Sequence, residues 1–101
     1  MLESKIQSKS IKRLKQSGWE VVRNTHVTPS GWPDVTCYKK GKIIFIEFKA
    51  PGKKPTELQT YRHEQLRKQG FTVHVVDNPD SIIIQTMAAM PIKKKHEATI
   101  R

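Results

Sequence analysis

The feature that most constrains the fold of this chain is a run of four large apolar residues, Ile43 to Ile46, just behind a glycine turn. A continuous apolar run of this length is typical of a central strand that is buried on both faces. The preceding run, Val35 to Tyr38, is also rich in residues that favour strands, and residues 39–42 separate the two. Two such runs around a short turn that contains glycine predict a β-hairpin.

Charged side chains stand at one end of this apolar hairpin. Asp34 precedes the first run, and Glu47 and Lys49 end the second. If the loop is the two residues Lys40-Gly41, Asp34 falls opposite Glu47, and Lys49 shares their face because side chains alternate along a strand. A three-residue loop with a bulge at Gly41 would instead shift the pairing by one residue and separate the two acids.

Each of these charged residues also has an ordinary structural explanation. Asp34 follows Pro33 and suits a turn, while Glu47 and Lys49 suit a solvated strand end. Together, at the end of a buried strand, they carry a desolvation cost that usually has a functional reason. Two adjacent carboxylates repel each other unless a cation lies between them. The acid pair and its lysine therefore predict phosphodiester hydrolysis assisted by Mg²⁺.

The net charge of the chain indicates which classes of molecule it binds. Its 101 residues include 19 Lys and Arg against 9 Asp and Glu, a formal net charge of +10. A basic excess of this size indicates nucleic acid or an anionic membrane as the partner. We expect no membrane partner, because no apolar stretch of the sequence is long enough to span a bilayer. Cys37 is the only cysteine, which excludes an intramolecular disulfide.

The segment before the hairpin predicts a helix and a strand. Apolar residues recur at helical spacing along residues 2–17, and Gly18 follows as a stop signal. Residues 19–24 predict a first strand, and residues 25–32 the loop that leads to the hairpin.

The segment after the hairpin predicts a helix, a strand and a further helix. Thr56 and Gln59 have the spacing of a capping box, which opens a helix that ends at Gly70. A strand over residues 71–76 follows, and then a third helix over residues 78–91. The order αβββαβα is that of an α/β fold, a mixed sheet with helices on both faces.

We expect a single domain over residues 1–91 and a basic C-terminal tail over residues 92–101. The third helix offers more apolar surface than one solvent-facing helix needs, so we expect a two-fold symmetric homodimer. The apolar residues of that helix are Ile82, Ile83, Ile84, Met87 and Met90.

The motifs together resemble the PD-(D/E)XK nuclease superfamily. The resemblance rests on Gly31-Trp32-Pro33-Asp34, Glu47-Phe48-Lys49 and the later Gln59, and it runs from Glu3 to Val76. The first helix and the Gly-x-Pro-Asp turn look like the VRR-NUC family in particular, in its stand-alone phage type. The resemblance implies a restriction-endonuclease-like core and a metal-dependent, structure-selective DNA endonuclease. Stand-alone members resemble dimers that resolve four-way (Holliday) junctions, so it also implies branched DNA as a partner.

The resemblance implies a metal site. Asp34, Glu47 and the backbone carbonyl of Phe48 would hold Mg²⁺ or Mn²⁺, and Glu3 of the first helix would approach the same ion. Hard divalent cations prefer such oxygen ligands. For Glu3 there is also a simpler explanation, an acid in the first turn that the helix dipole favours.

Two further residues would assist the chemistry. Lys49 would stand beside the attacking water and the scissile phosphate, where its charge offsets the negative charge that develops. Gln59 would hold the water or the phosphate, although its amide could equally serve the capping box of Thr56. His63, His74 and His96 have no metal-ligand spacing.

Two other classes of function stay open, a non-catalytic nucleic-acid-binding module and a basic interaction protein. The acids argue against the first, because a binder has no use for an acidic pair that faces phosphates. The N-terminus has no signal-peptide pattern, so we expect a cytoplasmic protein, in the host cell if a phage encodes it.

Overall fold

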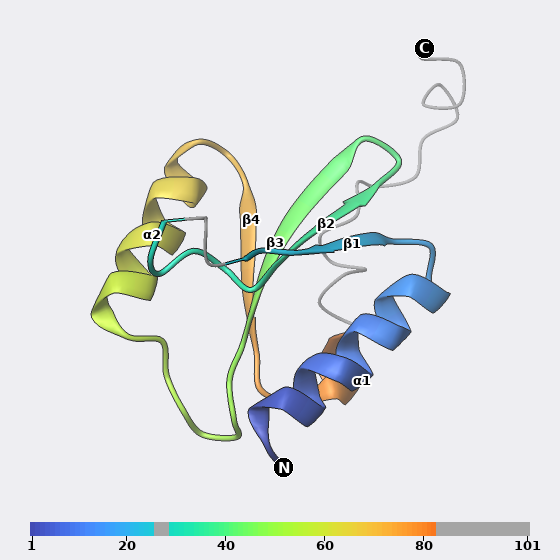
Figure 1. Cartoon of the computed structure of the whole chain (residues 1–101). Coiled ribbons are helices and arrows are strands. Elements are labelled where there is room, and N and C mark those ends of the chain that lie inside the picture. Colours follow the sequence, from blue (N-terminus) through green and yellow to red (C-terminus); the bar gives the residue numbers. More distant parts are fainter. Residues whose placement is uncertain (26–28, 83–101) are drawn as a thin grey trace.

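A four-stranded mixed sheet in the order β1-β2-β3-β4 forms the centre of the fold in the computed structural model, which describes residues 1–25 and 29–82 (Figure 1). The first three strands pair antiparallel, whereas β3 and β4 are parallel. Their bounds are Glu20–Arg23 for β1, Val35–Lys39 for β2, Lys42–Phe48 for β3 and Thr72–Val76 for β4. The mixed sheet confirms the predicted fold class, and the central position of β3 explains its continuous apolar run.

The hairpin between β2 and β3 has the two-residue loop that places both acids on one face. Lys39 pairs with Lys42, and the loop residues Lys40 and Gly41 both have positive φ, at 48° and 78°. Positive φ at both central positions defines the turn type that matches the twist of a tight hairpin. Glycine adopts this conformation without strain, so Lys40-Gly41 sets the register and excludes the bulged alternative.

Helix α1, Glu3–Gln16, covers one face of the sheet and buries most of the core (Figure 1). Leu2 is the N-cap of this helix and 71% exposed, so the apolar stripe that the sequence predicted begins at Ile6 instead. Burial of each large aliphatic side chain stabilises the fold by about 1.5–3 kcal/mol. The largest members of this cluster that are less than 2% exposed are Phe48, Ile6, Leu14, Ile44, Ile46 and Ile82.

Helix α2, Glu57–Lys68, covers the other face, where the apolar cluster is smaller (Figure 1). Phe45, Leu66 and Val73 form its buried part. Trp32 packs edge-on against Phe45 at 6.0 Å between ring centroids. This cluster does not extend to the end of β3, where polar side chains replace it.

A short 3-10 helix, η1, spans Pro79–Ser81 where the third helix was expected to begin. The side chain of Asn78 accepts a hydrogen bond from the backbone of Asp80 at 2.9 Å and starts this turn. Ile82 is 1% exposed and belongs to the core beneath α1, so its assignment to a dimer surface was wrong. The predicted continuation of the helix to residue 91 and the tail over residues 92–101 lie outside the described residues. No helix within residues 1–25 and 29–82 is long and apolar enough to cross a membrane.

Candidate active site

The turn that carries Asp34 is held against the sheet by the side chain of Asn24. The Asn24 amide donates to the carbonyl of Pro33 at 2.7 Å, and its backbone N–H donates to the carbonyl of Asp34 at 2.8 Å. The carboxylate of Asp34 in turn accepts a hydrogen bond from the backbone N–H of Phe48 at 2.8 Å. These contacts bring the acid across from β2 to the end of β3.

Gly31 lets the same turn approach α2 closely. Its φ is +83°, and a Cβ atom at this position would stand 2.8 Å from Cγ of Leu58 and 2.9 Å from its carbonyl oxygen. Any side chain would therefore collide with α2 as well as adopt an unfavourable conformation. On the same helix, Arg62 donates to the carbonyl of Ser30 at 2.9 Å, so α2 fixes the turn before Asp34 from two points.

Glu47 is the polar centre of the site, and its side chain is only 2% exposed. Its Oε2 accepts a hydrogen bond from Nε2 of Gln59 at 3.0 Å and lies 4.0 Å from Nζ of Lys49. Its Oε1 lies 3.6 Å from Nε2 of His63. Asp34, Glu47, Lys49 and Gln59, all predicted from the sequence, are thus brought together at the end of β3.

Burial is the main reason that the pKa of Glu47 rises from 4.5 to about 8. The negative charge of Asp34 raises it further, Lys49 opposes the rise, and Glu3 makes the smallest contribution. A carboxyl with a pKa this high needs either a proton or a cation to be stable at neutral pH. Glu3, exposed in the first turn of α1, lies within electrostatic range of Glu47.

The donor set fits a hard divalent cation. Asp34 and Glu47 offer carboxylate oxygens, and Oε1 of Glu47 is buried with no hydrogen-bond partner among the described residues. In a strand, N–H and C=O of one residue point to the same side, so the carbonyl of Phe48 faces Asp34 as its N–H does. Within residues 1–25 and 29–82, no three His, Cys, Asp or Glu side chains form a metal cluster. Two carboxylates with one carbonyl match Mg²⁺, which retains several waters, and ligation by these groups and by Glu3 stays a prediction.

Comparisons with known proteins identify the family. The sequence profile of the archaeal Holliday junction resolvases, Hjc, matches residues 5–69. A relative named as nuclease p44, from Acyrthosiphon pisum secondary endosymbiont phage 1, is 34% identical over 79 residues, which are 77% of this chain and 85% of the relative. The chain belongs to the Hjc resolvase family. It also superposes on a solved VRR_NUC domain with a TM-score of 0.77 and 28% identity, over 87% of this chain and 97% of that one.

Membership of the Hjc family confirms the predicted nuclease fold and the resemblance to VRR-NUC domains. The chain is a nuclease of this family, related to a phage protein as the motifs predicted. The restriction-endonuclease-like core therefore explains why the acids meet at the end of β3.

Gln59 serves the capping box that the sequence offered as its structural role and also contacts Glu47, whereas its contact with water or phosphate stays a prediction. The side-chain Oε1 of Gln59 accepts a hydrogen bond from the backbone N–H of Thr56 at 2.8 Å. The backbone N–H of Gln59 donates to the hydroxyl of Thr56 at 3.2 Å. These two contacts complete the capping box that begins α2. The other end of the same amide binds Glu47, so the start of the helix and the acid are joined through one side chain.

His63 is the residue of this Hjc-family site that sequence reasoning missed. Its side chain is 2% exposed and faces Glu47, and burial followed by the charge of Arg67 lowers its pKa. The available signal was its spacing, because His63 follows Gln59 by four residues and therefore lies on the same helix face.

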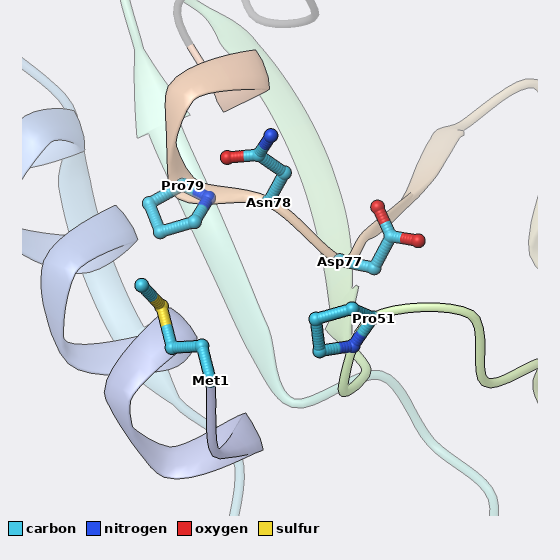
Figure 2. Close-up of a pocket in the computed structure, with 5 residues that line it drawn as sticks. All are labelled: Met1, Pro51, Asp77, Asn78 and Pro79. Atoms are coloured by element: carbon cyan, nitrogen blue, oxygen red, sulfur yellow. The ribbon is translucent and has the colours of Figure 1, made fainter.

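Of two pockets in the described part of the chain, one includes a residue of the site and the other does not. One, of about 280 Å³, runs along the turn that carries Asp34 and is lined by residues 24–25 and 29–34. Figure 2 shows another, of about 330 Å³, between the start of α1 and the loops that follow β3 and β4. The larger pocket contains none of the four clustered residues, so geometry and charge locate the Hjc-family site better than cavity size does. Its lining residues are Met1, Pro51, Asp77, Asn78 and Pro79.

Proposed function

We propose that this chain is a divalent-metal-dependent DNA endonuclease that cuts branched DNA, with the four-way junction as its preferred substrate, and that it acts as a homodimer. The observation that carries the proposal is the meeting of Asp34, Glu47 and Lys49 at the buried end of β3 in a chain of net charge +10. A binding protein would gain nothing from an acid pair that repels phosphate.

Asp34, Glu47 and the carbonyl of Phe48 would hold Mg²⁺ or Mn²⁺, with Glu3 approaching from α1. When bound, the ion would supply Lewis-acid stabilisation of negative charge on the reacting phosphate. The buried position of Glu47 keeps water from competing with its contacts and holds the carboxylate in one orientation. Asp34 is oriented by the N–H of Phe48, so each acid has a fixed partner before substrate arrives.

Lys49 would place a positive charge beside the scissile phosphate. Its side chain is only 12% exposed and lies on the face of Glu47, so its charge acts in a partly dry environment. There it would offset the charge that develops on the non-bridging oxygens and favour deprotonation of the attacking water. Gln59 would steady Glu47, and since its Nε2 carries a second N–H, it also suits the predicted contact with water or phosphate.

Exposed basic residues would bind the DNA backbone. Lys53 and Lys54 lie exposed in the loop between β3 and α2, next to the acid pair in the chain. On α1, Lys12 and Lys15 are exposed as well, whereas Arg13 pairs with Asp80 at 2.6 Å. Lysines that contact phosphates release counterions, so DNA affinity should fall steeply as salt rises.

Cleavage of matched substrates tests the proposal. A four-way junction, a flap and a linear duplex of the same arm sequences are incubated with protein in Mg²⁺, Mn²⁺ or chelator. We expect cleavage only with metal, fastest on the junction and in pairs of cuts across it. Equal cutting of all three substrates would make the chain a structure-tolerant nuclease. Binding without any cutting would leave the non-catalytic module as its function.

Sedimentation at micromolar concentration tests the homodimer separately. Paired cuts across a junction need two sites of opposite polarity, which a two-fold axis provides. A purely monomeric protein that still resolves junctions would remove the dimer from the proposal and leave the nuclease intact.

A further inference from the structure

The two oxygens of the Glu47 carboxylate have different surroundings. Oε2 accepts a hydrogen bond from Gln59 at 3.0 Å, whereas Oε1 faces Nε2 of His63 at 3.6 Å. In the part of the chain that the structure describes, both Oε1 of Glu47 and Nε2 of His63 are buried polar atoms with no hydrogen-bond partner. The two atoms that lack a partner therefore lie opposite each other across this 3.6 Å gap.

Gln59 and His63 stand four residues apart on α2, so they lie on one helix face and reach the same carboxylate from two points. A separation of 3.6 Å exceeds a hydrogen bond by about 0.5 Å. A small turn of the carboxylate about the Gln59 contact would close that gap. Since a carboxylate oxygen has two lone pairs, Oε1 could accept from an imidazole N–H and still bind a cation.

We propose that His63 is a positioning residue whose Nε2–H holds Oε1 of Glu47 in the orientation that a divalent cation requires. The inference rests on the proposed metal-dependent function and assigns to α2 the task of fixing both oxygens of one ligand. An uncharged donor suits this task, because it orients the carboxylate without cancelling the charge that attracts the metal. Outer partners of metal ligands commonly orient them in this way.

A purely structural explanation would treat His63 as a side chain that fills space between α2 and the sheet. An apolar residue would fill that space without burying a polar atom that lacks a partner. The chain offers a direct comparison in His74 on β4, whose Nε2 is also buried and without a partner among the described residues. At His74, burial and the positive charge of Arg67 lower the pKa of the imidazole. Replacing each histidine by leucine therefore removes a similar group from two different surroundings.

The test measures Mn²⁺ binding by calorimetry on wild-type, His63→Leu, His63→Gln and His74→Leu proteins without DNA. We expect His63→Leu to weaken Mn²⁺ binding about 10- to 100-fold, the usual effect of losing an outer partner of a ligand. His63→Gln should restore most of the affinity, because its amide can donate to Oε1, and His74→Leu should bind like wild type. In cleavage assays, His63→Leu should need more metal yet approach the wild-type rate at saturation.

Thermal unfolding of each metal-free protein separates positioning from folding. Wild-type Mn²⁺ affinity in folded His63→Leu protein would overturn the inference, as would an equal loss of affinity in the leucine and glutamine variants. Asp34→Asn protein identifies which proposal has failed. If wild type binds Mn²⁺ and Asp34→Asn does not, an unchanged His63→Leu protein contradicts only the role of His63. If wild type binds no Mn²⁺, the proposed function fails and the inference fails with it.

Discussion

The two faces of the sheet differ at neighbouring positions of the same strand. Ile46 is fully buried in the apolar cluster beneath α1, whereas Glu47, 2% exposed, points to the polar cluster beneath α2. The backbone is the same, and only the alternation of side chains along β3 separates the two. Burial of Ile46 and its neighbours stabilises the fold, while burial of Glu47 costs stability and raises its pKa. Apolar packing on the α1 face therefore offsets the stability that is lost when Glu47 is buried on the α2 face.

The largest expected effect is the loss of cleavage in Glu47→Gln protein. The substitution keeps the shape and burial of the side chain but removes the charge that holds the metal, so we expect cleavage to fall more than about 10³-fold. Stability at neutral pH should stay the same or rise, because glutamine is neutral without the proton that Glu47, with its pKa of about 8, must take up on folding.

The matched control on the other face is Ile44→Ala. It should lower the free energy of unfolding by about 2–5 kcal/mol while the folded fraction still cuts DNA. Chemical denaturation and a cleavage assay with purified proteins measure both quantities. A Glu47→Gln protein that cuts at the wild-type rate would contradict the division of roles between the faces.

Lys49→Ala should reduce the cleavage rate about 10²–10³-fold, the scale expected for one electrostatic stabiliser. The side chain lies 4.0 Å from Glu47 and opposes the rise of its pKa, so its removal should also raise that pKa further. Single-turnover kinetics at saturating DNA measure the rate. A change confined to KM would make Lys49 a residue that binds DNA.

The metal-free protein should lose stability as pH rises from about 5 to 8. The pKa of Glu47 is raised from 4.5 to about 8 in the folded state, so the unfolded chain releases its proton first. The stabilisation is complete below pH 4.5 and is lost as pH rises towards 8, with a slope of at most about 1.4 kcal/mol per pH unit. Denaturation of wild-type and Glu47→Gln proteins across this range isolates the effect. Parallel curves for the two proteins would show that Glu47 titrates normally.

The smallest expected effects are the losses of stability in alanine variants of Gly41 and Gly31, which both have positive φ. Gly41→Ala, at the hairpin turn, should lower the free energy of unfolding by about 1–2 kcal/mol, because alanine adopts a positive φ only with strain. No steric clash adds to this cost, because nothing described lies within 4 Å of the added Cβ. Gly31→Ala should cost more, because its Cβ would meet Leu58 and displace the turn that carries Asp34. Gly31→Ala should therefore also weaken metal binding, whereas Gly41→Ala should not. Equal metal affinities of the two variants would mean that the turn at Gly31 adjusts to the added Cβ without moving Asp34.

The hairpin and the acid pair could be predicted because local chemistry determines them. Lys40-Gly41 sets the loop length, the loop sets the register, and the register places Asp34 beside Glu47. The capping box at Thr56 is equally local. The site residues Asp34, Glu47, Lys49 and Gln59 followed from these patterns, and their catalytic roles stay predictions.

The contacts of His63, Asn24 and Ile82 could not be predicted, because they depend on how separate elements pack. His63 meets Glu47 only when α2 docks on the sheet at a particular angle, which Leu66 and Phe45 help to set. The apolar pattern around Ile82 suggests a helix face, yet the chain turns at η1 and buries this residue under α1. Spacing along the sequence places His63 on the helix face of Gln59, but it does not say which strand that face contacts.

The shared use of Gln59 limits how the loop between β3 and α2 can vary. Residues 50–55 lie outside both elements, so their sequence and length can change without moving the acids. One residue inserted between Thr56 and Gln59 would rotate the amide by about 100° around the helix axis. It could then keep the capping contact or the contact with Glu47, but not both. Insertions should therefore be tolerated before Thr56, in the loop, but not between Thr56 and Gln59. Thr56 thus marks the point at which the length of the chain becomes fixed.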